Sequence, residues 1–112
     1  MARNLMSFLR LQRENDEHAA TGSTSRQAAH LGFTPAFFDF ATCTVYPSRF
    51  ADGRPAPFHI LDGLPEAAVV DRAPSGRVVS AKATLIAGFV RGGFFYTRRA
   101  AAHAAQDWGT RV

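Results

Sequence analysis

The feature that most constrains the fold is an alternating segment, residues 77–91, that runs directly into a double-glycine turn. The odd positions of this segment are apolar from residue 79 to residue 89, whereas the even positions 80, 82 and 84 are polar. This two-residue period predicts a half-buried antiparallel strand, because successive side chains of a strand point to opposite faces. The segment is longer than an ordinary strand, so we expect a break or bulge near residues 83–84 or at Gly88.

The residues that follow predict a hairpin and a C-terminal helix. Glycines 92–93 permit positive φ at both central positions of a tight turn, so residues 94–96 are expected to pair back on the alternating strand. Thr97 is the best helix N-cap in the chain, and we expect a helix over residues 98–108 that Gly109 ends. The apolar face of this helix has spacings of three and four residues and comprises Ala101, Ala104, Ala105 and Trp108.

Two further strands are expected upstream, separated by a long proline-containing connection. Residues 40–46 alternate between apolar side chains and β-branched or aromatic ones, which predicts a strand ending at Pro47. Residues 67–72 predict a short strand, and residues 74–76 a turn after it. The connection over residues 47–65 contains four prolines, so we expect turns and extended segments there rather than a helix.

Together these elements predict an α+β fold, a small antiparallel sheet of three to five strands packed by a C-terminal helix. A length of 112 residues favours one domain, which we place at residues 31–112. Residues 1–30 are expected to form a helical or flexible arm, with a short helix over residues 4–14 before a polar, mobile stretch. The candidate partner-binding residues of this arm are apolar and comprise Leu5, Phe8, Leu9 and Leu11.

The charge of the chain is positive and is concentrated in its C-terminal half. The formal net charge is +4, and residues 72–106 carry six cations and no acid. Such a charge permits attraction to nucleic acid, an anionic membrane surface or an acidic protein, but selects none of them. The abundance of Arg and Ala also matches a simple coding bias. The hypothetical anion- or nucleic-acid-binding set comprises Arg77, Lys82, Arg91, Tyr96, Arg98 and Arg99.

Arg98 and Arg99 occupy the first turn of the predicted helix, where the helix dipole is already positive. Two cations there are unfavourable by a few tenths to about 1 kcal/mol each, and a bound anion would relieve that conflict. The alternative is that both side chains extend into water or pair with Asp71, Glu66 or Asp107. We favour this alternative, because dipole effects at exposed positions are small.

The sequence does not predict a catalytic or metal site. Cys43 is the only cysteine, which excludes an intramolecular disulfide, and the four histidines lack the spacing of a helical metal site. Asp39, His59 and Asp62 are metal-ligand types whose convergence the sequence does not show, so we expect no metal or cofactor. A nucleophilic Cys43 with His59 or His103 as its base is a distant alternative, because the alternating pattern places Cys43 on an apolar face.

The function that these patterns favour is a non-catalytic binding module, adaptor or regulator that acts through the acidic surface of a protein partner. The alternative is sequence-nonspecific nucleic-acid binding by the Arg-rich half, with an affinity that falls steeply with salt. A homodimer formed by edge-strand pairing is compatible with each. No apolar run approaches the roughly 18 residues needed to span a membrane, so we expect no membrane insertion and a cytoplasmic location.

Overall fold

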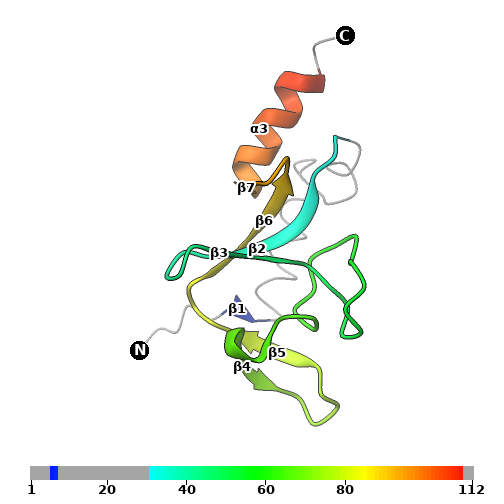
Figure 1. Ribbon diagram of the computed structural model, residues 1–112, viewed down its shortest axis with the longest axis vertical. Coiled ribbons are helices and arrows are strands. Elements are labelled where there is room, and N and C mark those ends of the chain that lie inside the picture. Colours follow the sequence, from blue (N-terminus) through cyan, green and yellow to red (C-terminus); the bar gives the residue numbers. More distant parts are fainter. Residues whose placement is uncertain (1–5, 8–30, 110–112) are drawn as a thin grey trace.

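The computed structural model describes residues 6–7 and 31–109, with side chains over residues 31–106. Within these residues the chain forms two antiparallel sheets and a C-terminal helix (Figure 1). One sheet has the order β3-β2-β6-β7 and contains β2 (Thr34–Asp39), β3 (Thr44–Pro47), β6 (Leu85–Arg91) and β7 (Phe94–Thr97). The other has the order β1-β5-β4 and contains β1 (Met6–Ser7), β4 (Val69–Arg72) and β5 (Val78–Ala81). A short 3₁₀ turn, η1 (Glu66–Ala68), precedes β4, and helix α3 (Arg98–Gly109) ends the described chain. The predicted α+β fold is therefore confirmed.

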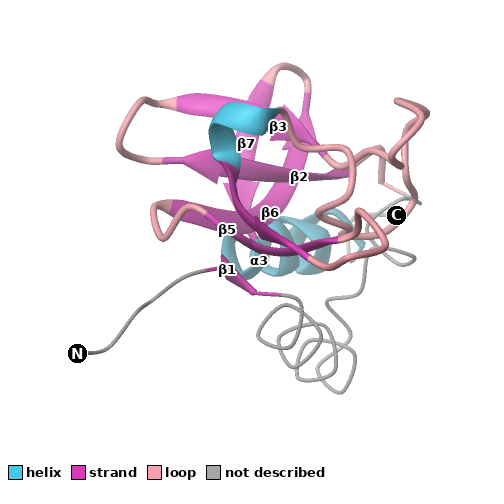
Figure 2. Ribbon diagram, turned by 90° about the horizontal axis from the view of Figure 1, so that it is seen from below, coloured by secondary structure: helices cyan, strands magenta, loops and turns pink. Residues whose placement is uncertain are grey.

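The long alternating segment is divided into two strands, as expected near residues 83–84. Strand β5 ends at Ala81 and β6 begins at Leu85, and the turn between them is closed by the Leu85 N–H, which donates to the Lys82 carbonyl at 3.1 Å. Since β5 and β6 belong to different sheets, this turn connects the sheets directly. Figure 2, a view along the long axis, shows the strands of both sheets lying around a common interior.

The core consists of two hydrophobic clusters. The first contains buried side chains from both sheets and from the connection before η1, namely Phe37, Leu61, Leu64, Ala68, Val78, Ala81, Leu85 and Ala87. The second joins α3 to the end of β6 through Phe33, Phe89 and Ala101, with Leu31, Tyr96 and Ala104 packed against them. Helix α3 thus uses the predicted residues Ala101 and Ala104, while the side chain of Trp108 lies outside the described residues.

The hairpin between β6 and β7 forms as the sequence predicts. Arg91 pairs with Phe94 across the turn, and Gly92 and Gly93 have φ values of 60° and 83°. Both values lie in the left-handed region that favours glycine, which explains why two glycines occupy the two central positions.

The strand expected over residues 40–46 is wrong in its first half. Strand β2 ends at Asp39, residues 40–43 form a turn, and β3 begins only at Thr44. The Asp39 carboxylate accepts the Ala41 N–H at 3.0 Å, and this local bond favours a turn over continued extension. Cys43 consequently lies exposed with a φ of 54°, rather than on an apolar strand face.

The N-terminal arm is described only at β1, which pairs in register with β5 through Met6 with Ala81 and Ser7 with Ser80. The helix expected over residues 4–14 is therefore wrong at these two residues, because their backbone belongs to a sheet ladder. The four predicted partner-binding residues of the arm, Leu5, Phe8, Leu9 and Leu11, lie outside the described residues, and their role stays a prediction.

An ion pair between a buried carboxylate and a partly exposed ammonium links the two sheets. Asp39, at the end of β2, has 0% exposure, and its Oδ2 accepts a hydrogen bond from Lys82 Nζ at 2.7 Å. The Lys82 ammonium is the main cause that holds the pKa of Asp39 far below its ordinary value, and the hydrogen bond from the Ala41 N–H also lowers it. The carboxylate in turn raises the pKa of Lys82. The charged form of each partner is therefore the form that the fold favours.

This ion pair predicts a specific pH dependence of stability. Because the folded pKa of Asp39 lies below the ordinary value of 3.8, its ionised form stabilises the fold above that pH, and this contribution is lost as the pH falls. The Lys82 contribution is lost only as the pH rises through its raised pKa, above 10.5. We expect Asp39→Asn to lower the urea midpoint at pH 7 and the gap to wild type to narrow at pH 3. A gap that stays constant between these two pH values would contradict the assignment.

The N-cap of α3 gives a second prediction. The Ala100 N–H donates to Thr97 Oγ1 at 3.0 Å, which confirms Thr97 as the cap. Thr97→Ala removes this acceptor and should lower the free energy of unfolding by about 1 kcal/mol, measured by urea denaturation. Thr97→Ser retains the hydroxyl and serves as the matched control, so an equal loss in both variants would refute the capping role.

Candidate binding pocket beside strand β3

The predicted anion-binding residues are not gathered on one surface. Arg77 Nε pairs with Asp62 Oδ2 at 2.7 Å beside the turn between β4 and β5, whereas Arg91 is at the β6–β7 hairpin, toward the other end of the molecule (Figure 1). Arg91 Nε donates to the Leu31 carbonyl at 2.6 Å, and its guanidinium lies over the Phe33 ring. Each of these two arginine side chains therefore already interacts with a neighbouring group of the same chain.

The other members of the predicted set occupy different environments. Lys82 is held by Asp39, as described above, and Tyr96 packs edge-to-face on the Phe33 ring with centroids 5.0 Å apart. Arg98 is 5% exposed, whereas its neighbour Arg99 is exposed. The expectation that both arginine side chains extend into water is thus wrong for Arg98.

The buried guanidinium of Arg98 is hydrogen-bonded to the ring of His59. Arg98 Nη2 donates to His59 Nδ1 at 3.2 Å, and His59 Nε2 donates to the Gly88 carbonyl at 2.7 Å. These two bonds require the neutral imidazole with its proton on Nε2. The ring also lies edge-to-face between Phe37 and Phe89, with centroid distances of 5.5 and 5.2 Å. His59 therefore fastens the long connection to β6 and to the start of α3.

The metal-ligand types that the sequence offered do not converge. Asp39, His59 and Asp62 each contact a different cationic side chain, and these are Lys82, Arg98 and Arg77 in that order. No group of three His, Cys, Asp or Glu side chains in the described part of the chain is placed to hold a metal ion. His59 has both ring nitrogens engaged elsewhere, so it is not arranged as a base for the exposed Cys43.

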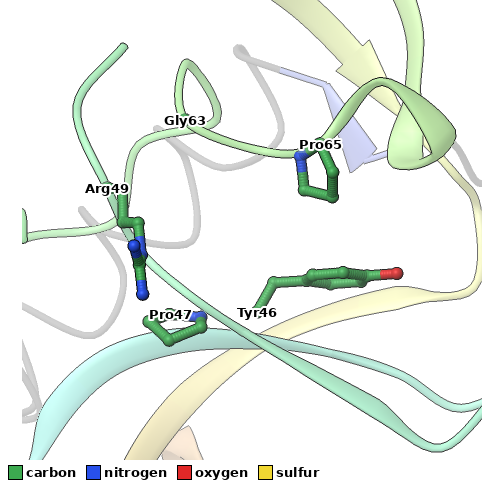
Figure 3. Close-up of a pocket in the computed structure, with 5 residues that line it drawn as sticks. All are labelled: Tyr46, Pro47, Arg49, Gly63 and Pro65. Carbon is green, nitrogen blue, oxygen red and sulfur yellow. The ribbon is translucent and has the colours of Figure 1, made fainter. Parts of the chain in front are cut away.

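An open pocket of about 280 Å³ lies between the edge strand β3 and the turn that leads to η1. Figure 3 shows the ring of Pro65 across the opening from the ring of Tyr46, with Pro47 and the side chain of Arg49 on the other side. The fifth lining residue is Gly63. The pocket is thus lined mainly by the rings of Tyr46, Pro47 and Pro65, and Arg49 is the single cation of the lining.

The pocket is shaped by close contact between two separated segments. A Cβ built on Gly63 would lie 2.4 Å from the Arg49 carbonyl oxygen, so only glycine allows the two backbones to approach this closely. Ser48, which is buried, fixes the same region, since its Oγ donates to the Phe58 carbonyl at 2.8 Å and accepts the Ile60 N–H at 2.9 Å. The pocket walls are therefore anchored by the connection itself.

The electrostatics of the pocket are set by Arg49. Its side chain is exposed and makes no hydrogen bond or ion pair with any residue that the structure describes. The two acids nearest in sequence to the lining turn are already neutralised, because Asp62 pairs with Arg77 and Glu66 pairs with Arg72. Arg49 thus offers an uncompensated guanidinium beside an apolar pocket.

Sequence reasoning missed this pocket. The sequence shows many prolines between Tyr46 and Pro65, and these predict rigid turns. They do not predict that the two ends of this connection lie together around a pocket. The close approach of the Arg49 backbone to Gly63 is a tertiary contact, and no local sequence pattern predicts it.

Comparison of the chain with protein-family models, with curated proteins and with solved structures found no match. None of the helices within the described residues is long and apolar enough to cross a membrane.

The buried histidine gives a stability prediction that separates its ring from its polar atoms. His59→Phe keeps an aromatic ring between Phe37 and Phe89 but leaves Arg98 and the Gly88 carbonyl without the bonds that His59 makes. We expect it to lower the free energy of unfolding by about 1–3 kcal/mol, measured by urea denaturation. His59→Ala, which also leaves a cavity, should cost more. A phenylalanine variant as stable as wild type would show that the two hydrogen bonds are dispensable.

Proposed function

We propose that this chain is a small non-catalytic binding module that acts through a protein partner, and that the pocket beside β3 receives an acidic segment of that partner. The observation that carries the proposal is the exposed Arg49 guanidinium, which has no ion-pair partner among the described residues and borders the apolar lining. An Arg guanidinium binds a carboxylate through paired, charge-assisted hydrogen bonds, so an acidic group is its natural complement.

The size of the pocket supports a peptide ligand. Its volume of about 280 Å³ lies just below the range for small-molecule sites, about 300–1,000 Å³. That space suits one or two side chains of a larger molecule better than an entire cofactor. The net charge of +4 adds long-range attraction toward an acidic protein surface.

Nucleic-acid binding is the weaker candidate. A protein that binds a phosphate backbone neutralises several phosphates with cations that remain free to make those contacts. Here Arg77 and Lys82 are held in ion pairs and Arg98 is buried, so the proposed set offers few exposed cations on one face. A single arginine that has no ion-pair partner among the described residues, beside a pocket lined by rings, fits an acidic peptide better than a phosphate backbone.

The proposal is tested by selecting displayed peptides on the purified full chain and measuring the affinity of the selected sequences. We expect enrichment of Asp and Glu, and a loss of affinity of about ten-fold in Arg49→Gln. Arg99→Gln is the matched control, because it removes the same charge from an exposed arginine on α3, and it should bind within about two-fold of wild type.

Two results would overturn the proposal. One is selection without acidic enrichment, and the other is an equal effect of the Arg49 and Arg99 substitutions, which would indicate attraction by net charge alone. Tight binding of oligonucleotides with a steep salt dependence, in place of peptide binding, would favour the nucleic-acid candidate.

A further inference from the structure

We infer that the ligand of this pocket is an extended, proline-containing acidic segment, with a proline ring seated against Tyr46 and Pro65 and a neighbouring carboxylate on Arg49. This inference rests on the proposed function and specifies the chemistry of the segment that the pocket takes. Three features of the pocket support it, namely its rigid walls, the scarcity of side-chain acceptors in its lining, and its charge.

The walls are rigid before any ligand arrives. Two of them are proline rings, which have essentially no rotamer freedom to lose, and the third is Tyr46, whose ring packs against the main core cluster. A pre-formed site avoids the entropic cost of ordering side chains on binding. Extended proline-rich segments share this property, because their backbone is already restricted, and they dock on aromatic-lined grooves.

The side chains that line the pocket offer a ligand few hydrogen-bond acceptors. Pro47 and Pro65 present only their rings and Arg49 only donates, so the Tyr46 hydroxyl is the one side-chain acceptor of the lining. A ligand N–H that is buried against these rings would be poorly satisfied, which is costly. Proline has no N–H and therefore enters without that penalty.

The charge places the acidic group next to the proline. Arg49 borders the same pocket as the two prolines, while the flanking acids Asp62 and Glu66 are already paired with Arg77 and Arg72. A carboxylate from outside the chain is therefore the complement that Arg49 lacks among the described residues. Its position within one or two residues of the proline follows from the small size of the pocket.

The test uses fluorescence anisotropy with the full chain and three matched, capped peptides. The first alternates proline with aspartate, the second replaces proline by alanine, and the third replaces aspartate by asparagine. We expect the first peptide to bind about ten-fold more tightly than either of the others. In Arg49→Gln the advantage of aspartate over asparagine should disappear, whereas Arg99→Gln should retain it, as in a double-mutant cycle.

The site of binding is checked by ¹H–¹⁵N spectra of the same samples. The Gly63 amide borders the pocket and should shift on addition of the first peptide. Spectra of the free variants also confirm that each remains folded, so a loss of binding is not mistaken for unfolding.

The outcomes distinguish a failure of the proline inference from a failure of the proposed function. If the alanine and proline peptides bind equally and both depend on Arg49, the proline inference is overturned while the proposed function stands. If the first peptide binds Arg49→Gln as tightly as wild type, or does not bind at all, the inference is overturned. A labelled oligo-thymidylate is measured in the same assay, and if it binds while none of the peptides does, both the inference and the proposed function fail.

Discussion

The contact between Asp39 and Lys82 is the interaction on which the arrangement of the two sheets depends. Asp39 ends a strand of one sheet, and Lys82 begins the turn through which the chain passes from the other sheet into β6. A fully buried carboxylate is tolerated only when it is paired and hydrogen-bonded. Lys82 and the Ala41 N–H meet both conditions, so the same side chain that fixes the sheet junction also turns the chain after β2.

That turn has consequences for the pocket. By ending β2 at Asp39, it returns the chain as edge strand β3 and presents Tyr46 and Pro47 beside the long connection. The connection is then held down by two buried polar groups, the Ser48 hydroxyl and the His59 ring, rather than by apolar contacts alone. A rigid opening with an exposed arginine is thus a product of how the connection packs, and this rigidity supports the proposal that a partner docks there.

Local sequence chemistry predicted the C-terminal half well and the middle poorly. The hairpin, the N-cap at Thr97 and the break before Leu85 each depend on a few adjacent residues, and all three are present. The alternation over residues 40–46 was misleading, because a hairpin turn and a strand can show the same short pattern, and the Asp39 side chain decided in favour of the turn. Arg98 was expected at the surface because its sequence neighbours gave no sign of a buried imidazole.

The sequence by itself therefore determined the elements whose causes act within a few residues: glycines where φ is positive, a hydroxyl that caps a helix, and an alternation that makes one strand face apolar. Only the tertiary structure decided the pairing of polar groups and the position of the pocket. His59 and Arg98 are 39 residues apart, and Asp39 and Lys82 are 43 residues apart. Such contacts form because burial makes an unpaired polar group costly, and that cost exists only once the core has brought distant segments together.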